Sequence, residues 1–377
     1  MAETTTPSYE AALDTLCSTT IAEAAIGVDR EGAFPARSIA ALKSAGLLGA
    51  LSSVESGGLG LGLAGAARIV RRLAEECGST AMIVTMHFSA VSVLEAYAPA
   101  GTRRDAASGA RLATLAFSEA GTRSHFWAPA GTAEARGDTV VLNAHKSWVT
   151  SASEADLYVW SSKPVSAEGV STLWLVPRSA AGLQIKGPFE GMGLRGNDSS
   201  PVVGTDVVVP RDAMLGTDGQ GFDIMMGAVL PVFQILNAAC SVGLMTGGLR
   251  RAIAHVSQTR HADTGAALVD LPTIRNYVAR MQIKTDMTAA LLADAVAAIE
   301  ANRPDTMLRV LECKAAAGET ANEVLDLAMR VCGGAAFRKD LGIERLFRDA
   351  RAAGVMAPTT DVLYDFIGKA VCGQPLF

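Results

Sequence analysis

The hydrophobic residues of this chain change their spacing twice, and this change limits the folds that the chain can adopt. From about Ser8 to Gly109 they follow a helical period, between about Arg111 and Pro210 they alternate as in strands, and from Gly221 onward they are helical again. This order predicts an α+β protein in which helices flank a small sheet domain. We expect an N-terminal α-helical domain at 1–112, a middle β-sandwich or barrel domain at 113–215 and a C-terminal four-helix bundle domain at 216–377.

The stretch from Ala116 to Ser151 contains two short motifs, A-F-S-E-A-G-T-R-S-H at its start and H-K-S-W-V-T-S at its end. Between them, Gly137-Asp138 predicts a tight turn that joins two strands. Trp148 is a large flat ring two residues before the hydroxyl group of Thr150. A ring and a hydroxyl group together suit a flat heteroaromatic cofactor, whose plane and edge they can fix. The alternative is a sandwich core with a buried tryptophan.

Composition and charge exclude several classes of protein. The net charge is −5 over 377 residues, and no block of Lys or Arg predicts a nucleic-acid or membrane surface. No apolar run reaches the roughly 18 residues expected of a membrane span. The polar N-terminus does not resemble a secretory signal. The six cysteines lie far apart without a C-x-x-C pair, which predicts buried thiols in a reducing cytoplasm and no metal site.

A single histidine, His87, lies in the middle of an almost wholly apolar helix predicted from Ser79 to Tyr97. A lone histidine on a buried helix is more often a hydrogen-bonded core residue than a catalyst. The position of His87 in an apolar helix therefore favours a structural role.

Several motifs, in order along essentially the whole chain, resemble those of the acyl-CoA dehydrogenase family. The A-F-S-E-A-G-T-R-S-H motif stands where the family has a T-E-P-G-A-G-S-D-like signature, and K-S-W-V-T-S looks like its K-x-W-[IV]-T-[NS]. The segment V-P-R-D-A-M-L-G-T-D-G-Q-G-F is similar to the one that leads into the family's C-terminal domain. V-C-G-G-A-A-F with I-E-R-L-F-R-D-A-R resembles its C-terminal signature. The resemblance implies the fold of that family and a flavoprotein oxidoreductase that acts on the CH-CH group of acyl thioesters.

The resemblance also implies FAD, bound where the β domain meets the C-terminal bundle and partly by a neighbouring subunit. The residues whose positions match cofactor-binding residues of the family are Phe117, Ser118, Ser124, Trp148, Val149, Thr150, Arg260, Gly333, Gly334 and Thr359. Trp148 and Thr150 would face the isoalloxazine, and Arg260 would pair with the FAD pyrophosphate of another subunit. Such shared sites imply a homodimer or homotetramer.

The sequence departs from the family at the catalytic base. The glutamate that removes the α-proton in a [IV]-Y-E-G-T segment is replaced by Ala357, and the alternative position on the long helix is Phe233. We expect His87 to replace this base, because its helix lines the acyl pocket in the family and its ordinary pKa suits proton transfer near neutral pH. Asp361, the other candidate, better suits the first turn of a helix, where negative charge is favoured. His125 stands where the family's first signature has an Asp. The family's intersubunit Arg is followed by an aromatic residue, and no such residue follows Arg260.

Three functions are compatible with these residues. The first is an FAD-dependent dehydrogenase with a non-standard base, which acts on an acyl-CoA or acyl-carrier-protein thioester and passes electrons to an electron-transfer flavoprotein. The second is a flavin-dependent monooxygenase of the same fold, which needs no carboxylate base. The third is a flavin scaffold that performs non-redox chemistry on an acyl thioester.

Overall fold

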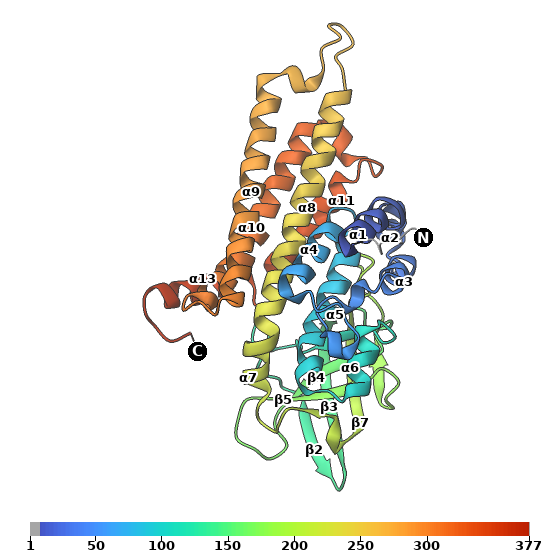
Figure 1. Ribbon diagram of the computed structural model, residues 1–377, viewed down its shortest axis with the longest axis vertical. Coiled ribbons are helices and arrows are strands. Elements are labelled where there is room, and N and C mark those ends of the chain that lie inside the picture. The colour runs from blue at the N-terminus through green and yellow to red at the C-terminus, as the bar shows by residue number, and fades with distance from the viewer. Residues whose placement is uncertain (1–7, 377) are drawn as a thin grey trace, which may run out of the picture.

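The computed structural model describes residues 8–376, and its three groups of elements follow one another along the long axis of the molecule (Figure 1). Strands lie at one end, the N-terminal helices pack beside the middle, and the longest helices extend to the other end. The N-terminal helices are α1 (Tyr9–Leu16), α2 (Ala22–Glu31), α3 (Ala36–Ser44), α4 (Gly62–Ala74), α5 (Gly78–Tyr97) and α6 (Ala100–Ala107). A π-helical turn, Cys17–Ile21, connects α1 to α2.

The middle part consists of two four-stranded sheets, as the prediction of a sandwich requires. The first has the order β1-β4-β5-β8 and the second β2-β3-β7-β6. The strands are β1 (Ala113–Ala116), β2 (Thr132–Arg136), β3 (Thr139–Val149), β4 (Leu157–Ser162), β5 (Thr172–Pro177), β6 (Leu183–Ile185), β7 (Ser200–Pro210) and β8 (Met214–Leu215). Only β1 and β4 pair in parallel among these strands of the described chain. The predicted turn joins β2 to β3, and Gly137 supplies the positive φ of +61° that it needs.

The C-terminal part contains three long helices that pack on one another and several short ones. They are α7 (Gly221–Ile224), α8 (Leu230–Gln258), α9 (Pro272–Glu300), α10 (Thr306–Cys332), α11 (Ile343–Ala350), α12 (Ala352–Val355) and α13 (Thr360–Val371). A π-helical turn, Met225–Val229, joins α7 to α8 and makes one helical rod of Gly221–Gln258. Pro231, which has no N–H group to donate, lies inside this rod directly after the π-helical turn, where the regular pattern of helical hydrogen bonds is already interrupted.

Helix α5 connects the three parts. It is buried on nearly all sides, and it packs against α4, α8 and β1. A helix that is apolar all round belongs in a protein interior. The apolar cores meet around it: one lies among the helices, one between α5, the first sheet, α10 and α13, and one between the two sheets.

Three of the described helical segments are long and apolar enough, by length and composition, to cross a membrane: Tyr9–Glu31, Gly78–Tyr97 and Gly221–Gln258. The expectation that no segment reaches this length is wrong for the folded helices. In the second and third segments 78% of the apolar window is buried inside the protein, so these residues form its core; in the first, 28% is buried. All six cysteines are free, five of them buried as predicted, and Cys372 is exposed.

Candidate active site

A buried ion pair fixes the loop that contains the first signature motif. Nζ of Lys146, on β3, lies 2.6 Å from Oε1 of Glu119 and also donates to the carbonyl and hydroxyl oxygens of Ser161. Oε2 of Glu119 accepts from the backbone N–H groups of Ala130 and Gly131 at 2.8 and 2.9 Å. Burial lowers the pKa of Lys146 to about 8, and the neighbouring carboxylate opposes that shift. The carboxylate of Glu119, near the start of loop 117–131, thus binds both Lys146 and the backbone at the end of the loop.

The second motif presents Trp148 to solvent and buries Thr150. The pairing of β3 with β7 shifts register between Lys146 and Val149, and Trp148 has a left-handed φ of +55°. Such a bulge re-aims a side chain. The indole is 63% exposed and stacks on Phe189 with ring centroids 3.8 Å apart. The hydroxyl group of Thr150 lies 3.3 Å from that of Ser199. The exposed ring of Trp148 is open to a planar group, and the prediction that Trp148 and Thr150 bind a cofactor stays a prediction.

Two predicted site residues that are 235 residues apart in the sequence meet where the middle part contacts the C-terminal part. Ser124 donates a hydrogen bond of 3.3 Å to the hydroxyl group of Thr359, which precedes α13. A surface cleft of about 520 Å³ lies beside this contact, a volume in the range of small-molecule and cofactor sites. The cleft is lined by His125, Trp127, Asp361, Val362, Asp365, Phe366, Lys369 and Leu376.

Two other predicted cofactor residues have buried side chains. Phe117 stacks on Phe126, and Val149 is buried in the core between the sheets. Ser118 is half-buried, and its carbonyl oxygen accepts from the N–H group of Ser147, which ties the two motifs together.

A buried lysine holds the segment in which the family has its catalytic glutamate. Lys314, on α10, donates to the carbonyl oxygens of Ala353, Met356 and Pro358 at 3.0, 3.0 and 2.8 Å. Burial lowers the pKa of Lys314 to about 7, but three accepting carbonyls match the three hydrogens of the ammonium form. Within this segment Ala357 is half-buried and lies against the core between α5 and α13. The backbone on both sides of Ala357 is therefore held in place, but the side chain at this position carries no acid.

His87 does not lie in the candidate site, and the prediction that it takes the place of the missing base is not supported by its position. Its side chain is fully buried, and Nδ1 accepts from the backbone N–H group of Ala113 at 3.1 Å. Burial lowers its pKa to about 4, against smaller opposing effects of the backbone of Leu48, Ala113 and Ala106. The helix was placed correctly, but His87 faces β1 and α6, because packing decides which side of a fully buried helix faces the pocket.

The remaining predicted cofactor residues lie at the far end of the bundle. Arg260 follows α8 in the hairpin-like connection to α9, at the opposite end of the molecule from the strands (Figure 1). Its guanidinium is exposed and donates to the carbonyl oxygen of Gly265. Gly333, with a φ of +54°, and Gly334 follow α10. No atom of the described chain lies within 4 Å of the place where a Cβ would stand on either glycine, so a ligand can approach the backbone closely.

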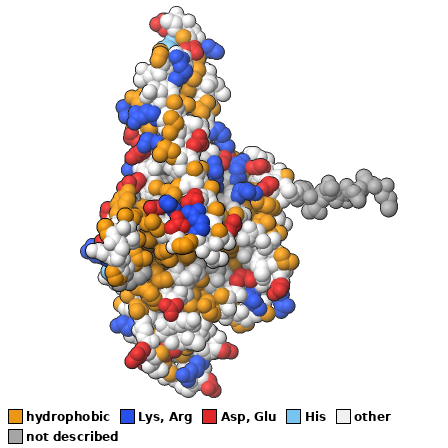
Figure 2. Space-filling view, turned by 60° about the vertical axis from the view of Figure 1, so that its left-hand side comes forward, with side chains coloured by type: hydrophobic (Ala, Val, Ile, Leu, Met, Phe, Trp, Pro, Cys, Tyr) orange, Lys and Arg blue, Asp and Glu red, His pale blue; other side chains and the backbone are white. Residues whose placement is uncertain are grey.

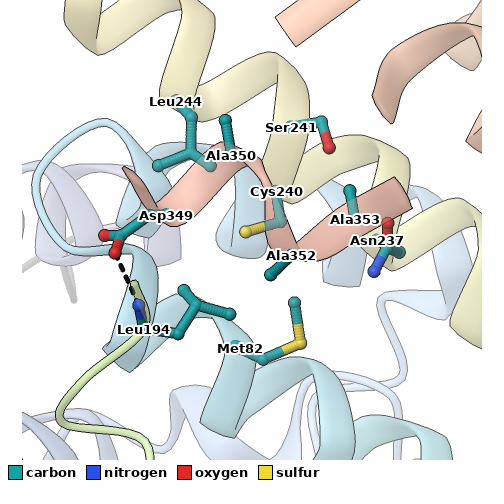
Figure 3. Close-up of a pocket in the computed structure, with 10 residues that line it drawn as sticks. All are labelled: Met82, Leu194, Asn237, Cys240, Ser241, Leu244, Asp349, Ala350, Ala352 and Ala353. Atoms are coloured by element: carbon teal, nitrogen blue, oxygen red, sulfur yellow. Dashed lines mark hydrogen bonds between the residues drawn. The ribbon is translucent and has the colours of Figure 1, made fainter. Parts of the chain in front are cut away.

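Asp349 lines a small cavity between α5, α8 and α11 (Figure 3). The cavity, of about 10 Å³, is also lined by Met82, Asn237 and Ser241. Oδ1 of Asp349 accepts from the N–H group of Leu194 at 2.6 Å. Burial raises the pKa of Asp349 to about 6, which exceeds the lowering by that hydrogen bond and by Arg345.

Sequence reasoning did not find Lys314, Gln234 or Asn237, although each has a recognisable signal. Lys314 stands between buried Cys313 and Ala315, and the two amides interrupt the apolar run of α8. A polar residue at a buried helical position needs a partner. The sequence shows the need but not the partner.

Comparison with known proteins gives consistent matches along the chain. Sequence profiles of the N-terminal, middle and C-terminal domains of acyl-CoA dehydrogenases match residues 8–105, 114–207 and 219–372. The chain is 28% identical to cyclohex-1-ene-1-carbonyl-CoA dehydrogenase of Syntrophus aciditrophicus, over 93% of this chain and 86% of that protein. It is also 28% identical to human mitochondrial short-chain specific acyl-CoA dehydrogenase, over 89% and 82%. Its fold is similar to that of butyryl-CoA dehydrogenase from Megasphaera elsdenii, with a TM-score of 0.90 at 21% identity, covering 99% of this chain and 100% of the other.

Proposed function

The chain belongs to the acyl-CoA dehydrogenase family, and from this premise we propose that it is an FAD-dependent oxidoreductase that acts on the CH-CH group of an acyl thioester. The observation that carries the proposal is the contact of Ser124 with Thr359 beside a cleft of cofactor size. FAD, when bound, supplies a hydride acceptor.

The residues of this chain fit the flavin end of FAD. Trp148 offers its exposed ring to a planar group, and the hydroxyl groups of Thr150, Ser124 and Thr359 offer hydrogen bonds. The Glu119–Lys146 pair holds the backbone of loop 117–131 in place for that contact. Rigid support of this kind is what a cofactor site requires.

We propose that Arg260, Gly333 and Gly334 hold the pyrophosphate end of the FAD of a second copy of the chain. The helical rod Gly221–Gln258 has 38 residues and is about 57 Å long, which exceeds the reach of one dinucleotide. Arg260 lies just beyond the end of this rod, in the connection between α8 and α9, and its exposed guanidinium supports a contact to the cofactor of a second copy.

Exposed apolar side chains support a homodimer or homotetramer. Ile283 and Met287 are 58% and 67% exposed on one face of α9, four residues apart. Hydrophobic side chains gather on the middle of the face that Figure 2 shows. Apolar surface of this kind marks an interaction site.

We propose that the reaction uses a base other than the family's glutamate, because Ala357 and Phe233 occupy both usual positions. Lys314 acts here as a positioning residue: its three hydrogens hold the carbonyl groups of the segment that contains Ala357. Asp361 is the acidic residue closest in sequence to this segment; it lies in the first turn of α13 and lines the cleft. The proposed carriers of the acyl group are coenzyme A or an acyl carrier protein, the electron acceptor is an electron-transfer flavoprotein, and the location is the cytoplasm.

Two measurements test this function. Mass spectrometry of the heat-released cofactor should find FAD; FMN, or no flavin after reconstitution, contradicts the proposal. Anaerobic mixing of the yellow protein with acyl thioesters should then bleach the flavin. If the flavin is not bleached but the reduced protein consumes oxygen and hydroxylates a substrate, the protein is a monooxygenase.

The variant Ala357→Glu tests the absence of the usual base, with Ala357→Gln as the control of equal size. If α,β-dehydrogenation is limited by the missing carboxylate, Ala357→Glu should raise its rate by about 10²–10⁴-fold and Ala357→Gln should not. Equal rates in the parent and Ala357→Glu mean that the parent already has an effective base elsewhere.

A further inference from the structure

Two buried carboxamide side chains on α8 lack hydrogen-bond partners. Gln234 is 0% exposed, and neither Oε1 nor Nε2 has a partner among residues 8–376. Asn237 is 1% exposed; its Nδ2 donates to Sδ of Met356 at 3.3 Å, and its Oδ1 has no partner within the described chain. Residues three apart on a helix are neighbours on its surface. Buried polar groups without partners destabilise the folded chain, so each needs an explanation.

One of the two amides contacts the segment in which the family has its catalytic glutamate. Met356, which Asn237 contacts, directly precedes Ala357, the position of the family's base. Asn237 also lines the small cavity with Ser241 one turn further along α8 (Figure 3). Gln234 lies one turn before Asn237 on α8. At this point α8 leaves the core between α5, the first sheet, α10 and α13 and enters the core among the helices. Asn237 is thus tied to the residue next to Ala357, and Gln234 lies one helical turn away from Asn237 on the same helix.

We infer that the protein takes acyl thioesters whose acyl group carries a hydroxyl group, and that Gln234 and Asn237 bind that hydroxyl group. This inference rests on the proposed function. The cavity beside Asn237, of about 10 Å³, has room for one water-sized group. A hydroxyl group has that size, and it both donates and accepts, as the unpaired amide oxygen and amide hydrogens require.

The charges around the cavity disfavour an acyl group that ends in a carboxylate. Lys314 has no hydrogen left for a ligand, because three backbone carbonyls accept all three. Asp349 lines the same cavity, and its carboxylate form would repel a second carboxylate. A plain alkyl chain would leave both amides unpaired. A neutral hydroxyl group satisfies the site without an added charge.

The test compares ligands and variants by binding and by stability. The probes are the pantetheine thioesters of butyrate, 2-hydroxybutyrate and 3-hydroxybutyrate, because pantetheine is common to coenzyme A and acyl carrier proteins. The variants are Gln234→Met and Asn237→Leu, which keep the size of each side chain and remove its polar atoms. Gln282→Met is the control, because Gln282 is an exposed amide on α9 that is paired with Asp286. Binding is measured by calorimetry on the holoprotein, and Tm is measured without thioester.

The parent should bind one hydroxylated thioester about tenfold or more tightly than the butyryl thioester. Gln234→Met and Asn237→Leu should lose this preference and keep or raise Tm, because an unpaired buried polar group has been removed. Gln282→Met should change neither.

Three results overturn the inference. The first is a parent that binds butyryl and hydroxybutyryl thioesters with equal affinity. The second is a lower Tm in both α8 variants with an unchanged preference, which would mean that the amides hold structural water. A parent that binds none of the three thioesters also overturns the inference, whereas the proposed function is decided separately by the FAD content and the bleaching of the flavin.

Discussion

Lys146 and Glu119 form a buried ion pair, with Nζ and Oε1 2.6 Å apart, that joins the two signature motifs of the middle domain. Lys146→Met leaves the Glu119 carboxylate buried without its cation and should lower the free energy of unfolding by about 3–5 kcal/mol. The double variant Lys146→Met/Glu119→Gln should recover part of the loss, because Gln still accepts from the N–H groups of Ala130 and Gly131. Urea unfolding measures these differences.

Lys163→Met provides the control for this prediction, because Lys163 is exposed at the end of β4. It should change the free energy of unfolding by about 0.5 kcal/mol or less. A loss in Lys146→Met as small as that in the control would show that the ion pair does not hold the loop.

Asp349 should make the protein less stable as the pH rises from about 4 to 6. Burial raises its pKa to about 6, above the value in an unfolded chain. At a pH between the unfolded and the folded pKa, the folded state keeps a proton that the unfolded state has released, so the free energy of unfolding falls as the pH rises. Above pH 6 the whole of this loss in unfolding free energy remains. Asp349→Asn stays neutral and retains an oxygen for the N–H group of Leu194. It should flatten the profile of unfolding free energy between pH 4 and 6.

The control for Asp349 is Asp138→Asn, an exposed position in the β2–β3 turn where Asn is equally suited. Its profile should follow that of the parent. If Asp349→Asn shows the same slope as Asp138→Asn, the carboxyl group of Asp349 has an ordinary pKa.

His87→Asn should lower stability and leave the chemistry intact. The variant removes a hydrogen bond to the Ala113 N–H group inside the core. Stopped-flow measurement should therefore find a rate of flavin reduction, per folded molecule, within a few-fold of the parent. A decrease of about 10²–10⁴-fold in a folded variant would instead identify His87 as the base.

Arg260→Ala should lower the FAD content of the purified protein without unfolding the chain. Arg260 is exposed, and within one chain its guanidinium donates only to the carbonyl oxygen of Gly265 on the surface, so its loss should leave the fold intact and remove the contact to a cofactor held by a partner. Arg136→Ala, an exposed arginine beside the β2–β3 turn, is the control. Absorbance at flavin wavelengths and size-exclusion chromatography report both effects. An Arg260→Ala protein as yellow and as oligomeric as the control would remove Arg260 from the cofactor site.

The sequence by itself determined the order of elements and the position of the cofactor motifs. The apolar period placed the helices and most strands, because burial of one face needs apolar residues at fixed intervals. It missed β8, which is short, and β2, which is mostly exposed, was indicated only by the turn at Gly137-Asp138. The spaced motifs indicated Trp148, Ser124 and Thr359, and the last two meet although 235 residues separate them.

Only the tertiary structure decided where the polar side chains of the buried helices point. His87, Lys314 and Gln234 all stand in apolar stretches of helical sequence. His87 accepts from a backbone N–H group, Lys314 donates to three carbonyl groups, and the amide of Gln234 has no partner in the described chain. The helix of His87 is buried on nearly all sides, so it has no amphipathic pattern to fix its rotation. Its orientation follows from packing against distant elements, and the chemistry of its polar residues follows from that orientation.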